Sequence, residues 1–144
     1  MELKTPEEYD DSFKNWRKSI DKLPFIPDEF QLKPITGRGN NRKQLTAIKK
    51  MITSKDCTEV VNACDAAREG ELIFRRIVEY AKVKYPTTRM WLQSLTNDAI
   101  QSAWDNRASS SDYQPLRDAA VSRAEADWII GMNGSRAVSY THLT

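Results

Sequence analysis

One stretch of the sequence, from Glu59 to Tyr80, constrains the fold more than any other. It opens with the β-branched pair Val60 and Val61 and places Asp65 shortly after them. The apolar positions that follow at helical spacing are Ile73, Ile77, Tyr80 and Ala81. This order predicts a strand, a tight loop and a helix. In an open α/β sheet, ligands bind where a strand ends and the next helix begins, so we expect the functional site at this loop.

The composition is that of an ordinary globular protein. The chain has 144 residues, 40% of them hydrophobic and 29% charged, with a formal net charge of +2, which predicts one domain and by itself indicates no nucleic-acid partner. No run is apolar enough to span a membrane, and no segment has the pattern of a signal peptide, so we expect the cytoplasm. The cysteines, Cys57 and Cys64, are then expected to be reduced. With His142 as the single histidine, zinc and Ser-His-Asp chemistry have little support.

The segments before this stretch carry weaker signals. Residues 1–29 are polar, and either form an extended arm or dock Tyr9, Phe13 and Trp16 through a short turn or helix. A strand is predicted within 30–35 and a turn at 37–40, where the glycines match a phosphate loop only loosely. The helix that follows has an apolar stripe of Leu45, Ile48, Met51 and Ile52. Its basic side belongs to a segment with five basic residues and no acid: Arg38, Arg42, Lys43, Lys49 and Lys50. That face is either simply solvated or contacts a DNA backbone.

After the central stretch, the pattern again alternates between strand and helix. A strand is predicted from Thr88 to Leu92, and a helix capped by Thr96. The expected buried stripe of that helix is Ala99, Ile100, Ala103 and Trp104. A break at the serines 109–111 precedes one long helix that runs from Leu116 past Trp128. The alternation predicts an α/β fold with mostly parallel strands.

The chemistry of the central loop rests on two carboxylates. Asp65 at the strand end and Glu69 at the helix start can face one point, and Mg²⁺ binds with one or two carboxylates while keeping several waters. Arg68 between them could hold a phosphate oxygen. Glu71 either serves the outer shell of the metal or only favours the helix dipole. The alternative reading, equally supported by spacing, is that Asp65 caps the turn and the glutamates are ordinary first-turn acids.

Three segments of the chain stand out in order: DAAREGELI (65–73), RMWLQSLTNDAI (89–100) and SRAEADWIIGMNGSRA (122–137). They resemble three motifs of the type IA DNA topoisomerases and are most similar to the topoisomerase III branch. The first resembles the acidic motif of the Toprim domain, Asp-x-Asp/Gly-Arg-Glu-Gly-Glu. The second is similar to the strand and helix start that follow it there, and the third resembles the opening helix of the next domain, which helps line the single-strand groove. The resemblance covers roughly residues 6 to 137.

The resemblance implies an ATP-independent isomerase that cleaves, passes and religates single-stranded DNA through a tyrosine. It implies Mg²⁺ held by Asp65 and Glu69, with Glu69 and Arg68 catalytic. DNA is then contacted by Arg68, Arg123 and Asp127. No small-molecule cofactor and no membrane partner is expected, and the full-length protein is expected to be a monomer.

The chain also departs from the family pattern. Ala67 stands where many relatives carry a second aspartate, and no segment matches the glutamate of the first Toprim strand. Tyr140 lies in a tail, Val138–Thr144, that does not continue the pattern, so we do not expect it to be the nucleophile. We therefore expect an internal fragment, with a partial Toprim domain at 1–108 and the first helix of the next domain, plus the tail, at 112–144. Alone it is expected not to relax supercoiled DNA.

Two other functions stay open. A non-catalytic DNA-binding module would use the basic 38–50 segment and the long C-terminal helix. Another Toprim enzyme, a primase or nuclease, would share the acidic motif, but the match at 122–137 argues against it.

Overall fold

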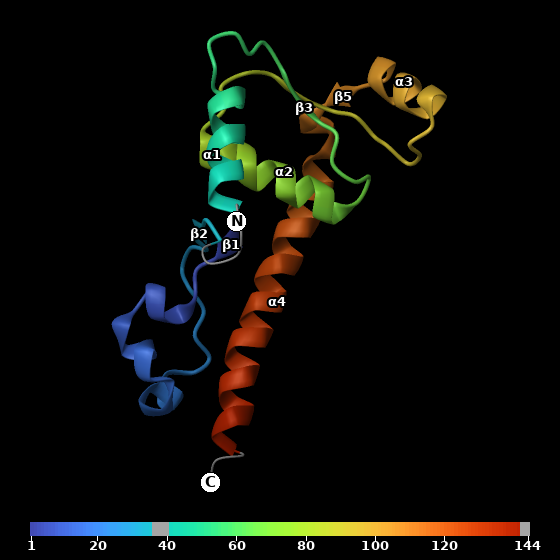
Figure 1. Ribbon diagram of the computed structural model, residues 1–144. Coiled ribbons are helices and arrows are strands. Elements are labelled where there is room, and N and C mark those ends of the chain that lie inside the picture. Colours follow the sequence, from blue (N-terminus) through green and yellow to red (C-terminus); the bar gives the residue numbers. More distant parts are fainter. Residues whose placement is uncertain (36–40, 142–144) are drawn as a thin grey trace. The chain divides into compact units, whose positions relative to one another are not determined.

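The computed structural model describes residues 1–35 and 41–141, and the chain forms two compact units (Figure 1). Unit 1 contains Met1 and residues 35–121, and unit 2 contains residues 2–34 and 122–144. Helix α4 (Gln114–Thr141) contributes its first residues to unit 1 and the rest to unit 2. The predicted turn at 37–40 lies outside the described residues. The predicted domain boundary between 108 and 112 stays a prediction, since compactness divides the chain elsewhere.

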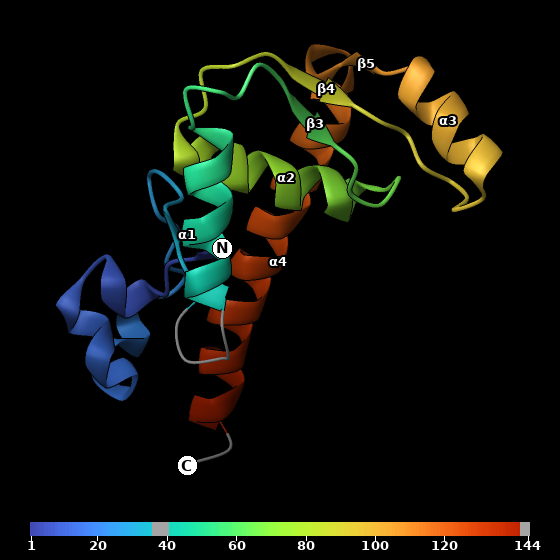
Figure 2. The same ribbon diagram turned by 45° about the horizontal axis from the view of Figure 1, so that its top comes forward.

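A small mixed sheet forms the centre of unit 1 and confirms the predicted α/β class. Strand β3 (Val60–Asn62) pairs in parallel with β4 (Thr87–Arg89), and β4 pairs antiparallel with β5 (Ala108–Ser109). The three strands lie side by side in Figure 2. The parallel pair was predicted, whereas β5 falls where the serines predicted only a break. Its pairing with β4 comes from tertiary contact rather than from local β propensity.

Helix α2 (Arg68–Ala81) follows β3 as predicted, but two of the apolar residues from whose spacing it was predicted are exposed. Ile73 is 55% exposed and Tyr80 is 38% exposed. The residues that α2 buries are Gly70, Glu71, Leu72, Phe74 and Ala81. A carboxylate can lie on the buried face because Glu71 pairs with Arg89 in the sheet and with Arg75 on the helix.

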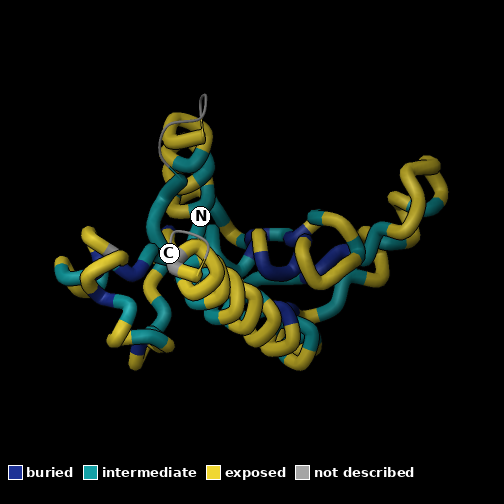
Figure 3. The backbone as a smooth tube through the Cα atoms, turned by 90° about the horizontal axis from the view of Figure 1, so that it is seen from below, coloured by how far each residue is buried: buried dark blue, intermediate teal, exposed yellow. Residues whose placement is uncertain are grey.

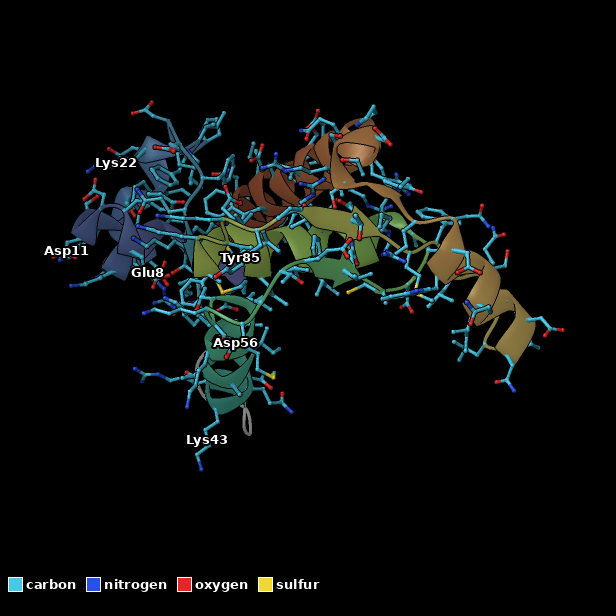
Figure 4. All side chains as sticks on the ribbon, turned by 90° about the horizontal axis from the view of Figure 1, so that it is seen from above. Glu8, Asp11, Lys22, Lys43, Asp56 and Tyr85 are labelled. Atoms are coloured by element: carbon cyan, nitrogen blue, oxygen red, sulfur yellow. The ribbon has the colours of Figure 1, made fainter. Side chains whose placement is uncertain are left out.

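Helix α1 (Asn41–Ile52) lies next to α2 and buries none of its residues fully. Leu45, Ile48 and Ile52 are half-buried, whereas Met51 is 63% exposed, so the predicted stripe holds at three of its four positions. The Tyr85 hydroxyl donates a 2.7 Å hydrogen bond to the Ser54 carbonyl just after α1, and Lys43 points away from the helix (Figure 4). The basic side of α1 therefore faces solvent.

Helix α3 (Asn97–Asp105) begins as predicted, because the Thr96 hydroxyl accepts a hydrogen bond from the Ala99 N–H at 3.4 Å. Its predicted buried stripe holds at two of its four positions, since Ala99 and Ala103 are half-buried whereas Ile100 and Trp104 are 38% and 45% exposed. The helix projects from the strands of unit 1 in Figure 2. The Trp104 ring instead carries the Arg107 guanidinium, 3.9 Å from the ring centroid.

Unit 2 is organised around Trp128 on α4. Strands β1 (Glu2–Leu3) and β2 (Leu32–Lys33) pair antiparallel. Between them in sequence lie the 3₁₀ helix η1 (Pro6–Glu8) and the 3₁₀ segment η2 (Asp11–Lys22), which is kinked where Asn15 and Ser19 have non-helical backbone angles. The Trp128 ring contacts Tyr9, Phe25 and Phe30, at centroid distances of 6.5, 6.1 and 5.4 Å. Its Nε1 donates a 3.0 Å hydrogen bond to the Lys4 carbonyl. Residues 1–29 therefore dock through short helices rather than forming an extended arm.

A second contact fixes β2 in unit 2. The Lys33 ammonium lies 2.6 Å from the Glu8 carboxylate, and this hydrogen bond lowers the pKa of Glu8 to about 2.

The long helix predicted from Leu116 is confirmed, and α4 begins two residues earlier. Figure 3 shows it as mainly exposed, with Ala120 and Trp128 as its buried residues. Within residues 1–35 and 41–141, no helix is long and apolar enough to cross a membrane.

Candidate functional site

The loop between β3 and α2 brings together three of the predicted site residues. Asp65 lies in the loop, and Arg68 and Glu69 open α2, with all three side chains exposed. In the part of the chain that the structure describes, the carboxylates of Asp65 and Glu69 make neither a hydrogen bond nor an ion pair. The residue at the N-cap of α2 is Ala67, which offers no side-chain cap. Asp65 therefore does not cap this helix, and its carboxylate is available to a ligand.

Directly beneath the loop, Glu71 is buried and 1% exposed. Its Oε2 accepts a 2.9 Å hydrogen bond from Asn62 Nδ2 on β3, and its Oε1 accepts one of 2.7 Å from Arg75 Nε. The Nε of Arg89 on β4 lies 3.6 Å from Oε2. A buried carboxylate is tolerated only when it is paired and hydrogen-bonded, as here. Glu71 is thus committed to internal contacts rather than to a metal or the helix dipole alone.

Arg89 carries the contact from this buried carboxylate to the loop. Its Nη1 donates to Asn62 Oδ1 at 2.7 Å and to the Cys64 carbonyl at 2.8 Å. Its Nη2 donates to the Asp65 carbonyl at 2.6 Å. One guanidinium therefore binds Asn62 at the end of β3 and the main chain of Cys64 and Asp65 in the loop. Arg89 thus holds the loop through main-chain carbonyls, which leaves the Asp65 carboxylate exposed.

Gly70 allows α2 to approach this loop. A Cβ at this position would lie 2.2 Å from the Asp65 carbonyl oxygen and 2.9 Å from the Asp65 nitrogen. Contacts that short force the backbone to move, so any side chain here would separate helix and loop. The glycine of the acidic motif is therefore required by close packing of the main chain and not by an unusual backbone angle.

The thiol of Cys64 is not activated by its charged surroundings. Burial raises the pKa of Cys64, and the nearby Arg89 charge does not offset that effect. The thiol therefore stays protonated at neutral pH, and a protonated thiol is a poor nucleophile. Its backbone N–H donates to Asn62 Oδ1 at 3.1 Å, which adds to the fixation of the loop.

Sequence reasoning missed Asn62 and Arg89 as residues of this site. Both are polar side chains inside short strands, and they are 1% exposed each. A charged residue in a strand that is covered on both faces needs a buried partner of opposite charge, and this requirement could have marked Arg89 as a residue of interest. The identity of its partner, Glu71, could not be predicted without knowing how α2 lies against the sheet.

The other predicted DNA contacts, Arg123 and Asp127, belong to unit 2. They lie one turn apart on α4 with Arg123 Nε 3.6 Å from Asp127 Oδ2, and their side chains are 55% and 71% exposed. An exposed pair of this kind contributes little to stability. Arg123 can therefore exchange its carboxylate partner for a phosphate at small cost.

The donor set of the loop fits a hard cation. No group of three or more metal-binding side chains occurs within residues 1–35 and 41–141. Asp65 and Glu69 nevertheless provide two unpaired carboxylates, and Mg²⁺ typically takes one or two of these and fills its remaining positions with water and phosphate oxygen. The oxygen donors and the solvent access at the loop suit that chemistry, whereas softer metals prefer sulfur or imidazole ligands.

The chain is similar over most of its length to bacterial proteins named DNA topoisomerase 3. It is 42% identical to that of Bacillus subtilis (strain 168) over 137 residues, which is 95% of this chain. It is 40% identical to that of Staphylococcus haemolyticus over 134 residues, or 93% of this chain. In both cases the chain spans 18% of the length of the relative. No protein-family model matches it. The resemblance predicted from the three motifs is confirmed.

The close approach at Gly70 predicts a specific cost of adding one methyl group. Gly70→Ala is expected to lower the free energy of unfolding by about 1–3 kcal/mol, as overpacking does elsewhere. Gly134→Ala is the matched control, because a Cβ there meets nothing within 4 Å and Gly134 lies inside α4. It should raise the free energy of unfolding by about 0.5–1 kcal/mol. Urea denaturation measures both, and equal effects would contradict the packing role of Gly70.

The buried carboxylate of Glu71 and the exposed carboxylate of Glu69 should differ in what they contribute to the free energy of unfolding. Glu71→Gln keeps the shape of the side chain but leaves two arginines without their counter-charge, and breaking buried pairs of this kind typically costs about 3–5 kcal/mol. Glu69→Gln, at an exposed position of the same turn, should change the free energy of unfolding by no more than about 0.5 kcal/mol. Urea denaturation of the two variants measures this contrast. A small effect of Glu71→Gln would show that the network does not hold the unit together.

Proposed function

We infer that this chain, which is homologous over 95% of its length to a segment of proteins named DNA topoisomerase 3, is the part of a type IA DNA topoisomerase that binds magnesium and positions DNA. The observation that carries the inference is the β3–α2 loop. There, two unpaired carboxylates are exposed while every neighbouring buried charge is paired. Its proposed contribution is to the cleavage, passage and religation of single-stranded DNA.

In this function, Asp65 and Glu69 hold Mg²⁺ at the end of β3. The bound ion supplies electrostatic stabilisation of the charge that develops on the scissile phosphodiester. Arg68, exposed beside the two carboxylates, binds a phosphate oxygen and keeps the phosphodiester in position. We assign no nucleophile to this chain, because no segment of it resembles the tyrosine motif of the family.

Unit 2 supplies a second contact to DNA in this proposal. Arg123 and Asp127 lie one turn apart on an exposed surface of α4, where a guanidinium can reach a backbone phosphate. Asp127 then orients the arginine before DNA binds. Single-stranded DNA as the substrate, a monomeric full-length protein and a cytoplasmic location stay predictions.

A non-catalytic DNA-binding module is the second candidate, and one observation favours it. The basic residues of α1 are exposed and lie on a helix that buries none of its side chains, namely Arg42, Lys43, Lys49 and Lys50. Such a face binds phosphates without any metal. A primase or nuclease is less well supported, because the relatives reported above are named topoisomerases.

Magnesium binding separates these candidates. Asp65→Asn combined with Glu69→Gln is expected to weaken Mg²⁺ binding by the 144-residue chain at least about tenfold, since both proposed ligands lose their charge. Isothermal titration with MgCl₂ measures the Kd. The matched control combines Glu79→Gln with Asp98→Asn, which removes the same charge from exposed positions elsewhere in unit 1. Unchanged affinity in the first variant, or an equal loss in the control, would falsify the metal site.

Single-strand binding tests the role of unit 2. Arg123→Ala is expected to weaken binding of a fluorescent oligo-dT and to reduce the slope of log Kobs against log salt concentration by about 0.7, the value for one phosphate contact on single strands. Fluorescence anisotropy over a salt series measures both quantities.

Two variants serve as comparisons in the same salt series. Lys18→Ala removes one exposed charge from η2 in unit 2 and should leave the slope unchanged. Lys43→Ala combined with Lys50→Ala removes charge from α1. If this double variant abolishes binding while Arg123→Ala has no effect, the non-catalytic module is the better description.

A further inference from the structure

We propose that Arg89 is the positioning residue of the metal loop, holding the main chain of Cys64 and Asp65 so that the Asp65 carboxylate is presented to Mg²⁺. This inference rests on the proposed function, because it concerns the same site. It goes further in assigning a role to a β4 residue that contacts neither metal nor substrate.

The contacts of Arg89 are directed at the loop rather than spread over the core. Its side chain is 0% exposed, and three of its hydrogen bonds end on consecutive parts of one segment: Asn62 Oδ1, the Cys64 carbonyl and the Asp65 carbonyl. The Asp65 carbonyl also accepts a 2.7 Å hydrogen bond from the Ala67 N–H. Two donors on this one oxygen fix the peptide that follows the proposed ligand.

Glu71 keeps the Arg89 guanidinium in this orientation. Oε2 of Glu71 lies 3.6 Å from Arg89 Nε and accepts from the Asn62 amide, whose oxygen in turn accepts from Arg89. The three side chains therefore form a closed set of contacts among α2, β3 and β4. Because α2 also carries Glu69, the same set links the positions of both proposed ligands.

Only arginine can make this arrangement. The planar guanidinium directs separate N–H groups to the Cys64 and Asp65 carbonyls, whereas a lysine ammonium is a point donor on a flexible stem. Arg89→Lys keeps the buried positive charge beside Glu71 but cannot reproduce this pair of bonds. The Arg89→Lys substitution therefore tests the geometry of the guanidinium separately from its positive charge.

Arg75 provides a matched control. It binds the other oxygen of Glu71, with Nε 2.7 Å from Oε1, and its Nη2 donates to the Ser110 carbonyl, away from the 62–65 segment. Arg75→Lys therefore perturbs the same buried carboxylate without touching the loop. A purely structural role of the arginines predicts similar effects of the two substitutions, whereas a positioning role of Arg89 does not.

The experiment measures the Kd for MgCl₂ and the thermal unfolding midpoint of the 144-residue chain in both variants. Arg89→Lys should raise the Kd about tenfold or more, the range seen when residues that orient metal ligands are replaced. Arg75→Lys should lower the thermal midpoint comparably and leave the Kd within about twofold, since Arg75 makes no hydrogen bond to the 62–65 segment and a lysine keeps the positive charge beside Glu71 Oε1. Equal effects on the Kd, or an unchanged Kd in Arg89→Lys, overturn the inference.

A measurement on the unsubstituted chain covers the case in which Arg89→Lys does not fold. Addition of MgCl₂ should shift the Nε–H resonance of Arg89 in a ¹H–¹⁵N spectrum, while that of Arg75 stays in place. An unmoved Arg89 resonance at saturating Mg²⁺ overturns the inference. Failure of the proposed function is distinguishable, because it appears as unchanged Mg²⁺ affinity when Asp65 and Glu69 are replaced together.

Discussion

The buried contact between Glu71 and Arg89 is the interaction on which unit 1 depends. It joins α2 to β4, and through Asn62 it also reaches β3. Its value lies less in net stability than in geometry, because desolvating two charges cancels much of their attraction. A hydrophobic contact at this place would allow α2 to slide or rotate, whereas an ion pair whose two partners are both hydrogen-bonded to Asn62 favours one orientation. The exposure of Ile73 follows from that orientation.

The same contact separates structural charges from those available for chemistry. Glu71 pairs with Arg75 and Arg89, and both arginines donate to main-chain carbonyls, so these three charges are not available to a ligand. Asp65 and Glu69 lie a few residues away with exposed, unpaired carboxylates. A loop whose main chain is held from below loses little further entropy when its side chains bind a metal, which is the physical basis of preorganisation. The candidate site is thus built as an exposed donor set on a fixed backbone.

Local sequence signals predicted the elements well and their faces less well. The strand before Asp65, the Thr96 cap and the long helix were predicted because propensity and capping act within a few residues. The buried stripe of α3 was predicted from periodicity, yet Trp104 is 45% exposed, since periodicity does not say whether a second layer is present. The strand β5 was missed because its two residues are ordered by β4 and carry no strand pattern of their own.

For the candidate site, the sequence identified which acids follow the strand and showed that they resemble a known acidic motif. It left open whether Asp65 caps the turn, and it assigned Glu71 to a metal shell or the helix dipole. Both questions required the folded structure, because the partners of Glu71 and Arg89 come from three different elements, and Arg89 reaches Asn62 across 27 positions of the chain. Hydrogen bonds of that kind leave no periodic signal, since their geometry arises only when α2 crosses the parallel pair of strands.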